Sequence, residues 1–196
     1  MAVIRKFKAV RPKRKFADKV AALPYDVVNS EEARAMTADK PYSFLHVDKA
    51  EIDLPVGTDI YSPKVYEKAR ENLYGLINNG VLFQDDKAML YIYELTMDGR
   101  SQSGLVACTS IDDYLNGIIK KHELTREDKE QDRIRHVDIC NANTGPIFLA
   151  YRTVDEISAV IDKIKKNDPV YDFTAEDGIK HRAWVIDNDD DINKLT

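Results

Sequence analysis

Glycine is scarce in this chain, and the glycine-rich motifs of several nucleotide-binding folds are missing. Only eight of the 196 residues are glycine, and they do not cluster. The sequence contains neither the GxxxxGK[ST] pattern of a phosphate-binding loop nor the GxGxxG pattern of a dinucleotide-binding turn. The HExxH pattern of a metalloprotease is also absent. A phosphate group would therefore have to be bound by side chains and by a helix end.

Cysteine, long apolar runs and excess positive charge are lacking as well. The two cysteines, Cys108 and Cys140, form no CxxC pattern, which favours a reducing cytosol over a disulfide scaffold. No stretch approaches the roughly 20 apolar residues of a membrane span, and the first residues contain no apolar signal-peptide core. The net charge of -5 argues against a general nucleic-acid-binding protein. We expect a cytoplasmic protein without a membrane partner, and the sequence predicts no particular oligomeric state.

Apolar residues are plentiful enough for a core, since they make up 43% of the chain. Strand and helix patterns are mixed, and this favours an α+β fold with a mixed, mainly antiparallel sheet, two hairpins and flanking helices. We expect residues 1–196 to form one α+β domain. The final residues DNDDDINKLT begin a helix pattern at which the chain stops. We therefore expect a longer protein to continue past Thr196.

The expected elements follow from apolar periodicity and from turn and cap residues. The strand-like segments are Phe7–Val10, Tyr42–Ile52, Pro146–Arg152 and two hairpins that turn at Asp98-Gly99 and at Glu176-Asp177-Gly178. The expected helices are Ser30–Ala38 with Ser30 as its cap, Ser62–Asn79, Ile111–Leu115, the charged stretch described next and Val154–Lys166.

The stretch Lys121–His136 has a helical pattern but almost no apolar residues. We expect Thr125 to cap a helix that begins at Arg126, with Asp128 in the capping-box position. Four basic side chains then recur on one face, namely Arg126, Lys129, Arg133 and His136. A row of this kind, next to the free N–H groups of a helix start, favours an anion site. Glu123, beside basic groups, would stay ionised and could accept a proton or bind Mg²⁺.

A different interpretation of the same stretch stays open. Runs of charged residues commonly face water, and pairs such as Lys129 with Asp132 could form along a solvated helix. His46 and His136 could be ordinary polar residues, and no pair of histidines has the spacing of a zinc site.

Five segments, in this order, carry a resemblance to a known family: FKAVRP, LPYDVVN, SFLHVDKAEIDLP, IIKKHELTREDKEQDRIRH and NANTGPIFLAY. Together they resemble the bacterial and archaeal domain-of-unknown-function family 1015 over nearly the whole chain. The family usually has Arg where this chain has Lys121. Its members are about twice as long and carry an ADGHHR-like motif further on, which looks like the phosphate-binding segment of the ParB/sulfiredoxin superfamily. The resemblance therefore implies that this chain is the N-terminal half of such a protein and is inactive by itself.

That resemblance implies a nucleotide-dependent kinase of a small hydroxyl substrate. Members of the superfamily bind nucleotides, some phosphorylate free L-serine, and family members are often encoded beside enzymes of phosphoserine metabolism. The implied cofactors are ATP or ADP and Mg²⁺. The residues that would serve are Glu123 and His122 for catalysis, Lys121, Thr125, Arg126, Lys129, Arg133 and His136 for phosphate, and Tyr25, Asp26 and Asn29 of PYDVVN for the substrate.

Two further classes of function remain open at this stage. The protein could be a non-catalytic nucleotide-binding regulator, as ParB relatives are. It could also be a partner-binding module whose basic row docks on an acidic surface. The segment PYDVVN could equally be a well-packed turn.

Overall fold

The computed structural model describes residues 2–122 and 125–196, which group into two compact units. We call residues 1–14, 84–123 and 149–196 the sheet unit, and residues 15–83 and 124–148 the helical unit. Helices and antiparallel strands occur together, which confirms the predicted α+β class. Each unit has its own hydrophobic core.

The sheet unit is built on a four-stranded antiparallel sheet with the strand order β5-β4-β8-β7. Its strands are β1 (Ile4–Arg5), β2 (Val10–Pro12), β4 (Leu90–Met97), β5 (Arg100–Val106), β6 (Cys108–Thr109), β7 (Tyr171–Thr174) and β8 (Lys180–Ile186), and its helices are α5 (Ile111–Leu115), α7 (Asp155–Ile164) and α8 (Asp189–Leu195). Both predicted hairpins are confirmed. Asp98 and Gly99 join β4 to β5 with positive φ angles of 51° and 74°, as the preferred two-residue hairpin turn requires.

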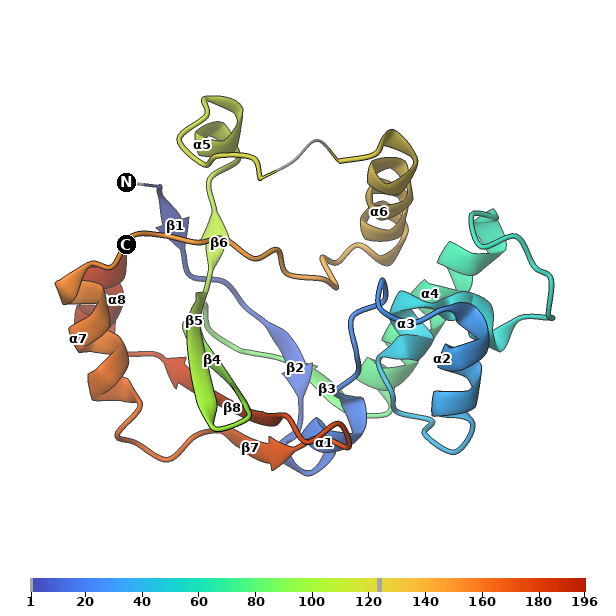
Figure 1. The fold of residues 1–196 in the computed structure, drawn as a ribbon, viewed down its shortest axis with the longest axis horizontal. Helices are drawn as coiled ribbons and strands as arrows, with labels where there is room; N and C mark the ends of the chain where they lie inside the picture. The colour runs from blue at the N-terminus through green and yellow to red at the C-terminus, as the bar shows by residue number, and fades with distance from the viewer. Residues whose placement is uncertain (1, 123–124) are drawn as a thin grey trace. The chain divides into compact units, whose positions relative to one another are not determined.

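Helices α7 and α8 cover one face of this sheet (Figure 1). Because side chains alternate along a strand, every second residue of β4 points to that face. Leu90 and Ile92 are fully buried there against the apolar sides of both helices. The next residue on the same face is Glu94, a carboxylate with 1% of its surface exposed.

The helical unit contains α1 (Ala17–Val20), α2 (Ser30–Thr37), α3 (Leu45–Asp48), η2 (Ala50–Asp53), α4 (Pro63–Asn78) and α6 (Glu127–Cys140). Where the chain passes from one unit to the other lie η1 (Arg14–Phe16) and β3 (Leu82–Gln84). The predicted helix after Ser62 is confirmed, with Pro63 as its first residue. Gly80, with a φ of 66°, follows its end.

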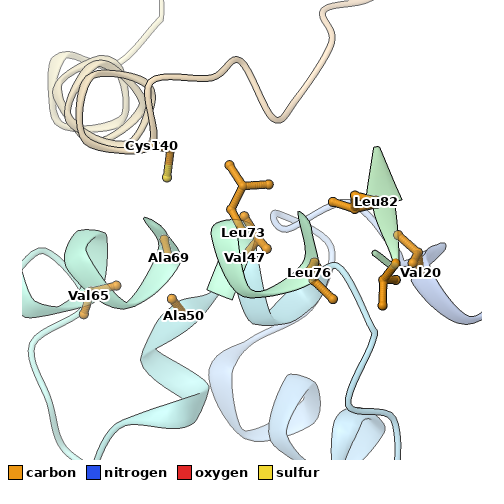
Figure 2. Packing of buried hydrophobic residues seen from close by; sticks show 10 residues of the cluster. Val20, Val47, Ala50, Val65, Ala69, Leu73, Leu76, Leu82 and Cys140 are labelled. Carbon is orange, nitrogen blue, oxygen red and sulfur yellow. The ribbon is translucent and has the colours of Figure 1, made fainter. Parts of the chain in front are cut away.

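The core of the helical unit forms along α4. Val65, Ala69, Leu73 and Leu76 recur at helical spacing and are buried against Val47 of α3 and Cys140 of α6, among others. Figure 2 shows the Cys140 side chain directed towards this side of α4. Helices α3 and α6 are therefore held on the same central helix, and this arrangement positions the side chains of the candidate site.

The predicted strand over Tyr42–Ile52 is wrong. This segment forms the helical turns α3 and η2, which bury Leu45, Val47 and Ala50. Branched and aromatic residues favour a strand only when a pleated surface is available to them. Here packing on α4 decides the conformation instead.

Two other strand predictions fail as well. Within Pro146–Arg152 the chain has no strand assignment, and Ile147 and Phe148 are 73% and 78% exposed. An apolar run predicts burial, but it does not supply a partner strand. Near the N-terminus, Phe7 forms only an isolated bridge to Met89, and the strand begins later, at Val10.

Candidate functional site

Helix α6 begins at Glu127, one residue later than predicted, and its N-cap is Arg126. The prediction that Thr125 caps the helix is wrong, since the N-cap position is occupied by Arg126, whose side chain makes no capping hydrogen bond, and Thr125 is an exposed residue outside the helix. The first turn carries three acidic side chains, Glu127, Asp128 and Glu130. They oppose a bound anion at this helix end, because they already provide the negative charge that the helix dipole favours.

One side of α6 is buried although the helix has few apolar residues, because polar side chains on that side contact the rest of the helical unit. Asp132, His136 and Cys140 follow one another at intervals of four residues and are 8%, 3% and 0% exposed. Asp132 and His136 each have a hydrogen-bond partner elsewhere in the helical unit. The solvated-helix interpretation therefore fails for this side of α6, which is held by polar contacts as well as by Cys140.

The predicted basic row does not act as one surface. Arg126 is exposed and pairs with Asp128 at 2.8 Å. Lys129 donates to the Tyr61 hydroxyl at 3.1 Å, and this hydrogen bond raises the pKa of Lys129. His136 is buried, with its Nε2 atom 3.1 Å from the Val47 carbonyl oxygen. Of the four basic residues, His136 thus belongs to the interior.

Arg133 has the most elaborate surroundings of the four. Its Nε and Nη2 atoms donate to Asp132 Oδ2 at 3.0 and 2.8 Å. The other carboxylate oxygen of Asp132 accepts from the Tyr66 hydroxyl at 2.9 Å. The guanidinium carbon lies 4.2 Å from the centroid of the Tyr25 ring, within cation–π range. Burial and the hydrogen bond to Asp132 raise the pKa of Tyr66 to about 12, so the phenol remains a donor at neutral pH.

A second carboxylate, Asp48 at the end of α3, belongs to the same group. Thr144 donates its hydroxyl to Asp48 Oδ1 at 2.8 Å. Burial raises the pKa of Asp48, and the Thr144 hydrogen bond and the charges of His136 and Arg133 offset this only in part. A carboxylate of raised pKa near a cation is a common feature of sites that move protons. We call the whole group the Arg133 cluster, and it consists of Tyr25, Asp48, Tyr66, Asp132, Arg133, His136 and Thr144.

Of the predicted substrate residues, the structure brings only Tyr25 into this cluster. Asn29 is the N-cap of α2, where its side-chain oxygen accepts from the backbone N–H groups of Glu31 and Glu32. The prediction that Ser30 caps this helix is therefore wrong by one residue. Asp26 is exposed in the turn between Tyr25 and Asn29.

The remaining predicted residues precede α6. Lys121 and His122 are exposed and belong to the sheet unit, where the Lys121 ammonium lies 4.8 Å from the centroid of the Tyr114 ring. Glu123, the predicted base, lies outside the described residues.

Comparison with known proteins identifies the family. The family model described as "Protein of unknown function (DUF1015)" matches residues 4–196. The chain belongs to the DUF1015 family. A search of curated proteins and a search of solved structures found no match. The predicted family is thereby confirmed.

The Arg133 cluster gathers segments on which the resemblance to DUF1015 rests. Tyr25 comes from LPYDVVN, Asp48 from SFLHVDKAEIDLP, Arg133 from the charged stretch and Thr144 from NANTGP. These segments are far apart along the chain and meet in the helical unit of the DUF1015 chain through the contacts above.

Four members of the cluster were missed by sequence reasoning, namely Asp48, Tyr66, Asp132 and Thr144. Tyr66 lies among the apolar residues that give α4 its helical spacing, and a buried tyrosine hydroxyl usually requires a partner. That requirement was a usable signal. Asp48 and Thr144 gave no such signal in the sequence. For Asp48, the helical turn that places it was predicted to be a strand.

Among the described residues, no three His, Cys, Asp or Glu side chains are grouped closely enough to hold a metal ion. Over the same residues, no helix has the length and apolar character needed to cross a membrane.

Proposed function

We propose that this DUF1015 protein is a nucleotide-dependent kinase of a small hydroxyl-bearing substrate, with free L-serine as the leading candidate. The observation that carries the proposal is the contact between Arg133 and the Tyr25 ring, at 4.2 Å. Sequence reasoning assigned these residues separately to phosphate and to substrate. Their contact supports one site in which a substrate and a cation meet.

Within this site, Asp48 is the proposed general base for the substrate hydroxyl. Its raised pKa, caused first by burial, brings it nearer to the range in which a carboxylate exchanges protons at working pH. Arg133 is the proposed cation for an anionic group of the substrate, and Lys129 is the proposed cation for the nucleotide phosphates. The catalytic roles of His122 and Glu123 stay predictions from the sequence, and the two residues form no part of this cluster.

The proposed Mg²⁺ is compatible with these residues. Magnesium commonly keeps several water ligands and is bound through nucleotide phosphates and one or two carboxylates, so a dedicated group of three acidic side chains is not needed. Bound with a nucleotide, it would supply charge neutralisation on the transferred phosphoryl group. Of the cluster's two carboxylates, Asp48 would bind it, because both oxygens of Asp132 already accept hydrogen bonds from Tyr66 and Arg133.

The first prediction tests this function directly. This chain, and the longest natural protein that contains it, are incubated with L-serine, Mg²⁺ and either ATP or ADP, and phosphoserine is measured by mass spectrometry. Asp48→Asn keeps the shape of the side chain but removes the base. We expect turnover to fall by about 10²-fold or more, with nucleotide affinity little changed. Asp138→Asn, on the exposed side of α6, is the matched control.

The outcome also separates the kinase from the alternatives. Absence of phosphorylated product across nucleotides and hydroxy amino acids would refute the kinase. Tight nucleotide binding without product would instead favour the non-catalytic regulator, and a salt-sensitive protein complex that ignores nucleotide would favour the partner-binding module.

We also propose a cytoplasmic location. Two free cysteines support it, one of them exposed and without a disulfide partner, since exposed thiols persist most readily in a reducing compartment. Fractionation of cells that express the tagged protein tests this proposal, and recovery in a secreted or membrane fraction would contradict it.

A further inference from the structure

Arg133 presents one open edge. Its Nε and Nη2 atoms are engaged by Asp132, and the face of the guanidinium lies on Tyr25. The Nη1 atom makes no hydrogen bond with the part of the chain that the structure describes, and 31% of the side chain is exposed. Protein groups therefore occupy the Nε–Nη2 side and one face of the guanidinium, and the Nη1 side can receive a ligand.

The orientation of Arg133 depends on residues that no ligand would touch. Asp132 lies beneath it, 8% exposed, and its second oxygen is held by the hydroxyl of Tyr66, which is 2% exposed. A carboxylate fixed at both oxygens cannot rotate freely. The Tyr66–Asp132 pair therefore restricts the positions that the Arg133 guanidinium can adopt.

The carboxylates nearest to Arg133 favour a carboxylate ligand over a phosphate dianion. Asp132 neutralises Arg133, and Asp48 adds a second carboxylate that interacts electrostatically with Arg133, while Lys129 interacts with Asp132 and Arg135 with Tyr66. A phosphate dianion at the open edge would be repelled by both carboxylates. A carboxylate carries one charge, and its planar pair of oxygens matches the guanidinium edge.

We propose that Arg133 binds the carboxylate of a small substrate, and that Asp132 and Tyr66 position Arg133 to do so. This inference rests on the proposed function for its reaction, because it names the substrate class of the same site. It differs from the sequence prediction, which assigned Arg133 to phosphate. Asp132 and Tyr66 are positioning residues.

The binding experiment uses no nucleotide, so that it can succeed or fail independently of turnover. L-serine, L-serinamide and inorganic phosphate are titrated into the protein, and binding is followed by amide and arginine side-chain NMR signals. We expect serine to bind at least about tenfold more tightly than serinamide or phosphate, the scale of a lost charged hydrogen bond. Equal affinity for serine and serinamide, or tighter binding of phosphate, would overturn the proposal.

Substitutions then test the positioning. Arg133→Lys keeps the charge but loses the planar edge, and we expect serine affinity to fall about tenfold with serinamide affinity unchanged. Tyr66→Phe removes only a hydroxyl, and we expect a fall of about five- to tenfold in the wild-type background but no further loss when combined with Arg133→Lys. Strict additivity of the two effects would refute the positioning role.

Matched controls exist in the same unit. Arg70 lies 5.7 Å from the centroid of the Tyr74 ring on α4, so Arg70→Lys and Tyr74→Phe repeat both changes at an arginine–tyrosine pair outside the cluster. Neither should alter serine affinity. The Nε–H signal of Arg133 provides a readout without ligand: it should be broadened in Tyr66→Phe and retained in Tyr74→Phe, whereas a purely structural role would leave it unchanged. Carboxylate binding without phosphoserine formation would support this inference and refute the kinase.

Discussion

At the scale of single residues, Glu94 of the sheet unit is a buried carboxylate that is surrounded by hydrogen-bond donors and cations. It accepts hydrogen bonds from Ser103 at 2.7 Å and from Arg182, and it pairs with Lys165. Burial by itself would raise the pKa of Glu94, but the bonds from Lys165, Ser103 and Arg182 outweigh it, so that the pKa lies below its ordinary value. Three strands and the end of α7 thus meet at one carboxylate.

The second prediction concerns this group. Glu94→Gln removes the charge between two cations, and breaking a buried ion pair from one side costs about 3–5 kcal/mol of unfolding free energy. Urea denaturation followed by circular dichroism measures it. Asp172→Asn removes the exposed ion pair with Lys180 in the neighbouring strand and should cost less than about 1 kcal/mol. Equal losses in the two variants would contradict this account.

The same group predicts a dependence on pH. Because the folded-state pKa of Glu94 is lowered, its stabilising contribution is present above the unfolded-state pKa, and it is lost as the pH falls through the folded-state pKa. The unfolding free energy of the wild type should therefore decline on acidification below about pH 4.3, the ordinary value for glutamate. In Glu94→Gln this decline should be smaller, as denaturation at a series of pH values would show.

At the scale of elements, helix starts decide which polar side chains remain available for a ligand. In α2 the N-cap Asn29 and Glu32 form a capping box, so the amide of Asn29 already has partners. In α6 the corresponding position is Arg126, and no side chain caps the helix. A residue such as Asn29 suits both a helix cap and a substrate contact. Its role therefore cannot be predicted before the first residue of the helix is known.

A third prediction separates the two roles of Asn29. Asn29→Ala should lower the unfolding free energy by about 1 kcal/mol, the usual effect of losing a cap. Asn29→Asp should restore it, because a carboxylate is an equally good cap. Thermal denaturation of both variants measures the effect. Serine binding that is lost in Asn29→Asp at full stability would show that Asn29 contacts the substrate after all.

At the scale of the whole molecule, two separate cores suggest two units of stability. Leu73 is buried in the core of the helical unit, and Ile92 in that of the sheet unit. Truncation of either to alanine should cost about 2–5 kcal/mol. We predict that hydrogen exchange will accelerate mainly in the unit that carries the substitution. Acceleration over the whole chain in both variants would show a single cooperative domain, as the sequence suggested.

Sequence patterns determined the features that depend on local chemistry. Asp98-Gly99 fixed a hairpin, Ser62-Pro63 and the spacing of apolar residues fixed α4, and the quoted segments fixed the family. These features depend only on neighbouring residues or on a repeated spacing, so they can be predicted without knowing which distant segments they contact.

Tertiary structure alone decided the conformation of Tyr42–Ile52 and the composition of the Arg133 cluster. Packing on α4 made that segment helical and so placed Asp48 near Arg133. On the buried side of α6, Asp132 accepts a hydrogen bond from the Tyr66 hydroxyl, and His136 is buried rather than exposed. The physical reason is that a charged side chain gains its role from the group opposite to it, and contacts between residues distant along the chain select that group.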